Sequence, residues 1–174
     1  MNRAEILDKL SAQHQDLMAF LNKLSEDQIH QQKEGKWSAL QNMDHLLKSI
    51  QVVNPAVRKP GFLLRQAFGR PNREARSYEG LVQRYQERLQ GAEAKAPKQY
   101  EAADSRHLNR QEVLKEYDQE VQCLLQYLGK VKEAKLDRTL LPHPLLGKLL
   151  MRELFYFMHY HTNHHWEAIK KSVA

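Results

Sequence analysis

The sequence predicts an all-α protein, a four-helix bundle with a long crossover between its second and third helices. Apolar residues recur at spacings of three and four along most of the chain, and the alternating runs that mark strands are nearly absent. Four long amphipathic segments are joined by one long connection and by shorter ones. With 174 residues, 41% of them hydrophobic, the chain can build one core, so we expect a single domain over residues 1–174.

The first two predicted helices are defined by an apolar stripe and by a cap. The first covers about residues 4–24, and its stripe consists of Ile6, Leu10, Leu17, Leu21 and Leu24. The second begins after Ser38, whose hydroxyl can accept a hydrogen bond from the Gln41 amide while the Gln41 side chain reaches back. We expect this helix to run to about Val57, with Pro55 weakening its end.

The long crossover carries most of the positive charge of the chain. Its prolines and glycines predict an irregular connection as far as a shorter helix at about residues 78–90. Between residues 58 and 76 one acid, Glu74, faces the bases Arg58, Lys59, Arg65, Arg70, Arg73 and Arg76, in a chain of formal net charge +6. A solvated linker is the preferred interpretation. The alternative is nucleic-acid binding, but no recognition motif accompanies the charge, so nucleic acid is not an expected partner.

The last two long helices complete the predicted bundle. Asn109 followed by Glu112 repeats the capping pattern, and the third long helix should end near Gly129. A turn with two prolines follows at residues 141–144. The last helix is expected from about Lys148 nearly to residue 174.

Four histidines lie on the last predicted helix. At 100° per residue, His161 and His165 fall inside the arc of apolar residues, whereas His164 lies at its edge and His159 well outside, at the surface. Two histidines spaced i and i+4 can place their ring nitrogens on a common metal ion. The alternative is a pair of core histidines satisfied by hydrogen bonds.

Periodicity does not select a third metal ligand. The candidates are the carboxylates and the histidines His14, His30, His45, His107 and His143. His45 lies opposite the apolar arc of the second helix, together with Ser38, Asn42 and Ser49. By itself this position predicts a surface residue, or one that lines a small polar cavity.

Several short motifs, in order, span most of the chain. They are Trp37-Ser38 with His45 eight residues after the tryptophan, LPHPLLGK at 141–148, Arg152-Glu153, and YHTNHH at 160–165. With this order and spacing the sequence resembles the DinB-like (DinB/YfiT) superfamily. The resemblance implies a four-helix bundle that holds a divalent metal ion, zinc or nickel, through His45, His161 and His165.

The resemblance also implies a class of activity. The superfamily is similar to metal-dependent transferases that use low-molecular-weight thiols and to metal-dependent hydrolases, so the expected substrate is a small thiol or a hydrolysable molecule. The motifs identify no catalytic residue. The alternative is a non-catalytic metal-binding or interaction bundle, and a nucleic-acid-associated stress protein is less favoured.

Three residues near the motifs have two interpretations each. His143 could lie behind a metal ligand or simply cap the last helix. His164 could make a contact at the rim of the site. Glu153 could face the site as an acid or base, but an ordinary charge in the first turns of a helix is the preferred interpretation.

Location and assembly are also predicted from composition. Cys123, the single cysteine, cannot form an intramolecular disulfide, and residues 1–10 lack the apolar run of a signal peptide. No apolar window has the length of a bilayer span. We therefore expect a cytoplasmic protein without a membrane partner. Phe155, Tyr156 and Trp166 lie outside the main apolar arc of the last helix and predict a homodimer.

Overall fold

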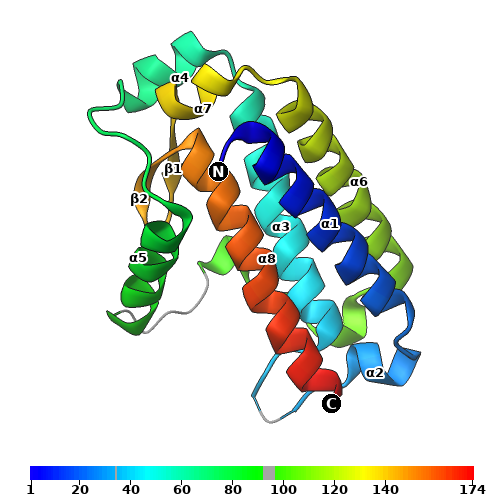
Figure 1. Cartoon of the computed structure of the whole chain (residues 1–174). Coiled ribbons are helices and arrows are strands. Elements are labelled where there is room, and N and C mark those ends of the chain that lie inside the picture. The colour runs from blue at the N-terminus through cyan, green and yellow to red at the C-terminus, as the bar shows by residue number, and fades with distance from the viewer. Residues whose placement is uncertain (34, 92–96) are drawn as a thin grey trace.

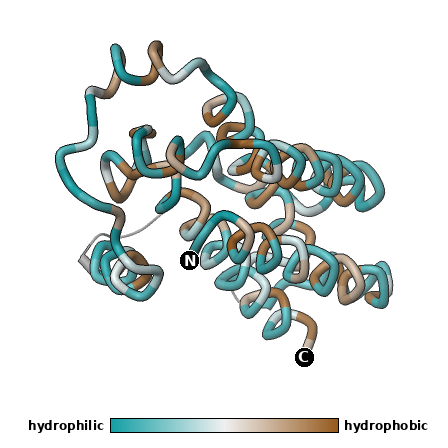
Figure 2. The backbone as a smooth tube through the Cα atoms, turned by 45° about the horizontal axis from the view of Figure 1, so that its top comes forward, coloured by the Kyte–Doolittle hydropathy of each residue, from teal (hydrophilic) through white to brown (hydrophobic). Residues whose placement is uncertain are grey.

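The computed structural model describes residues 1–33, 35–91 and 97–174 of the chain. Its four long helices are α1 (Arg3–Asn22), α3 (Ala39–Arg58), α6 (Arg110–Lys130) and α8 (Met151–Val173), and they lie side by side (Figure 1). Each of α1 and α3 packs against both α6 and α8, so α1 and α3 occupy opposite corners of a bundle. Hydrophobic and hydrophilic residues alternate along these helices (Figure 2), as packing around a shared core requires. The predicted all-α four-helix bundle is confirmed.

The predicted caps start the second and third long helices. The Ser38 hydroxyl accepts from the Gln41 amide at 3.2 Å, and the Gln41 side chain accepts from the Ser38 amide at 3.0 Å. The Asn109 side chain accepts from the Glu112 amide at 3.1 Å. Because these caps satisfy amides that have no partner within a helix, they fix where α3 and α6 begin.

Residues 140–150 form a β-hairpin, which the sequence analysis did not predict. Strand β1 (Leu140–His143) pairs antiparallel with β2 (Gly147–Leu150), and α8 begins at Met151 rather than near Lys148. Gly147 has a φ of +76°, in the left-handed region that favours glycine, and so permits the turn. Each strand has only four residues and β1 contains a proline, so the alternation of apolar and polar residues that marks a strand cannot be recognised in the sequence.

The crossover is more helical than the predicted irregular connection. Helix α5 (Tyr78–Gly91) is the shorter helix predicted at about residues 78–90, whereas α4 (Gly61–Phe68) and the single 3₁₀ turns η1 (Lys98–Tyr100) and η2 (Ser105–His107) were not predicted. Helix α4 buries Leu64 and leaves Phe62 and Leu63 exposed, and its eight residues are too few for a helical period to be read from the sequence. Two more short helices, α2 (Glu26–His30) and α7 (Glu133–Arg138), flank the bundle. In the described parts of the chain, no helix has the length and apolar character needed to cross a membrane.

The aromatic residues that led to the predicted homodimer pack within the chain. Phe155 and Tyr156 are buried. The Tyr156 ring meets Tyr78 of α5 edge-on at 5.9 Å between centroids, and the half-buried Trp166 packs against Phe20 of α1 at 6.4 Å. The inference of a second exposed apolar face on α8 is therefore wrong, because α5 and α1 cover it. The homodimer itself stays a prediction.

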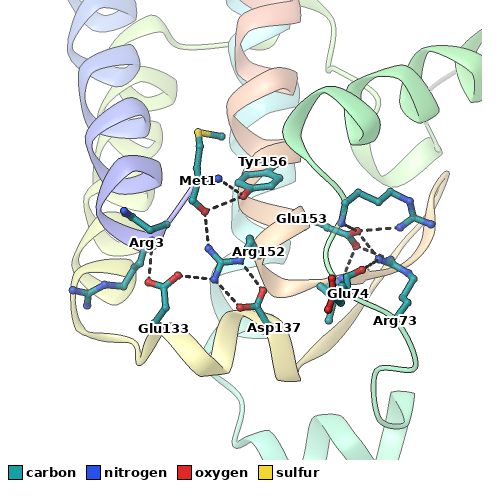
Figure 3. A network of polar contacts seen from close by, with 12 residues as sticks. Met1, Arg3, Arg73, Glu74, Glu133, Asp137, Arg152, Glu153 and Tyr156 are labelled. Carbon is teal, nitrogen blue, oxygen red and sulfur yellow. Dashed lines mark hydrogen bonds and ion pairs between the residues drawn. The ribbon is translucent and has the colours of Figure 1, made fainter.

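Two ion-pair groups, each centred on a buried residue of α8, tie the crossover and α7 to the start of this helix (Figure 3). The Arg152 guanidinium contacts the carboxylates of Asp137 and Glu133, each at 2.6 Å. The Glu153 carboxylate is fully buried and accepts from the guanidinium groups of Arg73, at 2.6 Å, and Arg76, at 3.0 Å. Although burial raises the pKa of Glu153, these bonds outweigh burial and hold it below its usual value.

The Glu153 network changes two interpretations made from sequence. Arg73 and Arg76 are anchors for the crossover rather than solvated charges of a linker. Glu153 is their partner, so it is neither a surface charge nor an acid or base at the histidines. Eight residues of α8, about 12 Å of helix, separate it from His161.

Candidate metal centre

The structure brings His45 of α3 together with His161 and His165 of α8. The Nε2 atom of His161 lies 3.1 Å from Nε2 of His45 and 3.2 Å from Nε2 of His165. The three side chains are buried, with exposed fractions of 6%, 5% and 8% for His45, His161 and His165. Three imidazoles therefore meet around one point inside the bundle.

Helix geometry and the packing of residues 100–105 against α3 explain why the three imidazoles meet. His161 and His165 share the inner face of α8 because four residues make about one turn. His45 lies on the polar side of α3, but every residue of α3 from Ala39 to Leu47 is buried. Residues 100–105 cover the polar side of this half of α3, so His45 is buried and the prediction of a surface position for it is wrong.

Hydrogen bonds orient two of the rings. The Nδ1 atom of His45 donates to the Tyr100 carbonyl at 2.6 Å, and Nδ1 of His165 donates to Oδ1 of Asn42 at 2.8 Å. The Asn42 amide is itself fixed, because its Nδ2 donates to the Ser38 carbonyl at 2.9 Å. A carbonyl oxygen accepts only, so the proton of each ring sits on Nδ1 and the lone pair of each Nε2 faces the shared point.

The electrostatic environment keeps the three rings neutral. Burial lowers the pKa of His45 and brings the pKa values of His161 and His165 well below 6.5. Each of these two also has the other histidines as neighbours, which disfavour a further positive charge. Neutral imidazole is the form that binds a metal ion.

The spacing of the nitrogens fits a metal ion. Two nitrogens at 2.0–2.1 Å from one zinc ion, at a tetrahedral angle, lie about 3.3 Å apart. Two of the three separations, at 3.1 and 3.2 Å, are close to this value, and the ligand atoms of the three histidines all lie within 4.8 Å of one another. In addition, Nδ1 of His161 is a buried atom without a hydrogen-bond partner among the described residues, so this ring can carry its proton on Nδ1 and present the lone pair of Nε2 to an ion.

Aromatic rings form the walls of the site. The half-buried Trp37 indole lies 5.2 Å from the His45 ring and stacks on His165 at 6.2 Å. Phe157 stacks on His161 at 4.9 Å between ring centroids. These rings limit rotation of the imidazoles and keep the surroundings of the three nitrogens apolar.

The other histidines named from sequence lie outside this cluster. His143 accepts at Nδ1 from the amides of Leu145 and Leu146 and so closes the hairpin turn. Its ring packs edge-on against Phe157, which separates it from His161, and burial lowers its pKa to about 4. The exposed His164 touches the edge of the His165 ring, as expected for a rim contact.

Three further histidines, His159, His14 and His30, make polar contacts away from the cluster. His159 was predicted at the surface but is half-buried, because α5 covers that side of α8 and the Tyr78 hydroxyl bonds to its Nδ1 at 3.0 Å. His14 pairs with Asp118 at 2.7 Å, and His30 contacts the Ser105 hydroxyl. None of these three belongs to the cluster of His45, His161 and His165.

Sequence reasoning missed two groups that orient the rings. Asn42 could have been found, because it precedes His45 by three residues and shares its helix face. The Tyr100 group is a backbone carbonyl, so no residue type marks it. It is placed by the fold of the crossover.

The fold and the cluster define a helical-bundle protein with a buried three-histidine group that could hold a metal ion. The family model of the DinB superfamily matches residues 9–169, and the chain belongs to this superfamily. Its structure is similar to the crystal structure of TT2238, a four-helix bundle protein, with a TM-score of 0.63, 20% identity, and coverage of 98% of this chain and 99% of that one. The curated proteins gave no match.

Proposed function

We propose that His45, His161 and His165 bind one divalent metal ion through their Nε2 atoms. The observation that carries this proposal is the orientation of the rings: the Nδ1 protons of His45 and His165 are used by Tyr100 and Asn42, so their lone pairs face His161. Zinc and nickel both suit three imidazole donors. Membership of the DinB superfamily supports a metal-binding role.

We further propose that the centre serves a metal-dependent enzyme, of the hydrolase or low-molecular-weight-thiol transferase type. Bound by three neutral ligands, a divalent ion retains its full charge and lowers the pKa of a water or thiol. The chain itself orients the imidazoles through Tyr100 and Asn42 and excludes bulk water with Trp37 and Phe157. Among the residues that the structure describes, no carboxylate belongs to the cluster, which favours an anionic ligand at a remaining position.

The second candidate is a non-catalytic bundle in which the metal ion is structural. The burial of all three histidines, each at most 8% exposed, is the observation that favours it. A nucleic-acid role has lost support, because Arg73 and Arg76, two of the bases that suggested it, are bound to Glu153.

A cobalt titration separates the two candidates. Protein purified without an affinity tag is analysed for metal, depleted and reloaded with Co²⁺, and its absorption is recorded with and without a small thiol. A thiolate-to-cobalt charge-transfer band that depends on thiol concentration supports the enzyme. Binding of cobalt with a spectrum that does not respond to thiols or anions supports the structural role, and failure to bind cobalt refutes the site.

A further inference from the structure

Residues 100–105, here called the strap, lie along the N-terminal half of α3 and are held there by its side chains. Lys48 Nζ donates to the Glu101 carbonyl at 2.8 Å, and Gln41 Nε2 donates to the Ala103 carbonyl at 3.0 Å. The Ser38 and Ser105 hydroxyls are 3.3 Å apart. Residues that recur at three- and four-residue spacing on one face of α3 thus bind successive positions of the strap.

Asp44 and Lys48 form the central part of this attachment. The Asp44 Oδ2 atom accepts from the Ala103 amide at 2.8 Å and from Lys48 Nζ at 2.7 Å. The Asp44 side chain is 8% exposed, and hydrogen bonds to a buried charge are stronger than neutral ones. We call the Asp44–Lys48 pair, with its bonds to Glu101 and Ala103, the clasp.

The clasp flanks the carbonyl that orients His45. Glu101 follows Tyr100 directly, and Ala103 lies two residues further on, so the position of the Tyr100 carbonyl depends on where these two residues are held. That carbonyl accepts from His45 Nδ1 at 2.6 Å. Asp44 and Lys48 lie close to His45 on the same helix, yet they act on its ring through a segment more than fifty residues away in the sequence.

We propose that the Asp44–Lys48 clasp positions His45 for metal binding by holding the strap, so that metal binding and attachment of the strap are coupled. This inference rests on the metal site proposed above. Losing a partner that orients a metal-bound histidine costs about 10- to 100-fold in affinity. Because coupling is reciprocal, the metal ion must strengthen attachment of the strap by the same factor.

The charges of Asp44 and Lys48 could also affect metal binding directly, without the strap. The two explanations predict opposite effects for one variant, Lys48→Met. The Asp44 carboxylate attracts a nearby cation and the Lys48 ammonium repels it. If these residues act by charge, Lys48→Met tightens Co²⁺ binding. If they act through the clasp, Lys48→Met weakens it, because the bond to the Glu101 carbonyl is lost while the apolar stem is kept.

The first experiment is a Co²⁺ titration of metal-depleted protein. We expect Lys48→Met and Asp44→Asn to weaken binding by about 10- to 100-fold, and Lys48→Arg, which keeps a charged donor, to restore part of the affinity. Asp137→Asn is the matched control, because it removes a carboxylate from an ion pair at the start of α8. Its affinity should stay within about twofold of wild type. Circular dichroism confirms that each variant is folded.

The second experiment reads the strap directly. Lys98 and Arg106 are exposed and flank it, so trypsin cleavage at these two sites, followed by mass spectrometry, reports its release from α3. Co²⁺ should slow this cleavage in wild type and in Asp137→Asn, and much less in Asp44→Asn and Lys48→Met.

Each outcome decides the proposal. Lys48→Met that binds Co²⁺ as tightly as wild type or more tightly, or cleavage that is indifferent to Co²⁺ in wild type, overturns the clasp and leaves the metal site standing. A wild-type protein that binds no Co²⁺ overturns the metal site, and the coupling with it.

Discussion

The imidazole of His165 donates to the side-chain oxygen of Asn42 across the interface between α8 and α3. Asn42 precedes His45 by one helical turn, so α3 supplies one ring of the cluster and also orients a ring of α8. The same helix contributes Ser38, whose carbonyl fixes the Asn42 amide. The geometry of the cluster is therefore set by the packing of these two helices.

Replacing Asn42 tests this relationship. Asn42→Leu leaves the His165 Nδ1 proton buried without an acceptor, which should lower stability by about 1–3 kcal/mol. Metal affinity should fall by about 10- to 100-fold, because the ring loses its fixed orientation. Asn42→Asp keeps the acceptor for His165 but loses the bond to the Ser38 carbonyl, so it should bind Co²⁺ more tightly than Asn42→Leu. Co²⁺ titration and urea unfolding measure both effects, and wild-type affinity in Asn42→Leu would show that the bond does not orient the ring.

His143 should make stability depend on pH. Its pKa is about 4 in the folded chain and about 6.5 when unfolded, so above pH 6.5 both states are neutral at this residue. As the pH falls from 6.5 towards 4 the unfolded state takes up a proton that the folded state does not, and stability is lost by about 2–3 kcal/mol after allowance for partial exposure.

A variant isolates this contribution from the other histidines. His143→Asn can still accept from the amides of Leu145 and Leu146 but does not titrate. Urea unfolding at pH 7 and pH 4.5 should show a smaller loss for His143→Asn than for wild type. Equal losses would mean that His143 is protonated without cost in the folded chain.

Glu153 should matter for stability and not for metal binding. Glu153→Gln leaves Arg73 and Arg76 without their buried counter-charge, and we expect a loss of about 2–4 kcal/mol. Glu133→Gln is the control: Glu133 is 49% exposed and Arg152 keeps Asp137, so its loss should be below about 1 kcal/mol. Thermal unfolding measures the stability of the two variants, and Co²⁺ titration measures their metal affinity. A loss of Co²⁺ affinity in Glu153→Gln without loss of stability would return Glu153 to the site.

The sequence predicts the features that depend on local patterns. Ser38 and Asn109 mark helix starts because a cap involves residues three apart. The i, i+4 spacing of His161 and His165 puts both on one face of the last helix, and the apolar residues that share this face mark it as the inner one. The features it misses depend on tertiary contacts. Helix α4 has a single buried side chain, Leu64, and the hairpin strands are four residues long.

His45 shows the same limit within the site. Its helix face is polar, which predicts exposure, and the strap that covers this face is separated from it by more than fifty residues. His159 and Tyr156 likewise look exposed on a helical wheel and are covered by α5. The periodicity of apolar residues divides a helix into an apolar and a polar face, but it does not show whether another element of the fold covers the polar face.

The last prediction concerns removal of the histidines themselves. His161→Ala or His165→Ala should abolish Co²⁺ binding, because two imidazoles remain where the site provides three. In an enzyme site the bundle should stay folded, since helix packing and not the ion supplies most of its stability. In a structural site the binding free energy is part of the folding free energy, and either change should lower the melting temperature to that of the metal-free wild type.

His164→Ala is the matched control for both changes. His164 is exposed on the same helix and touches only the edge of the His165 ring. Its removal should leave Co²⁺ affinity and melting temperature close to those of wild type. Melting curves with and without Co²⁺ for wild type and the three variants make the comparison. A large stabilisation of wild type by Co²⁺, with a spectrum that ignores added thiol, would contradict the enzyme and favour the structural role, because the ion would then act as a part of the core.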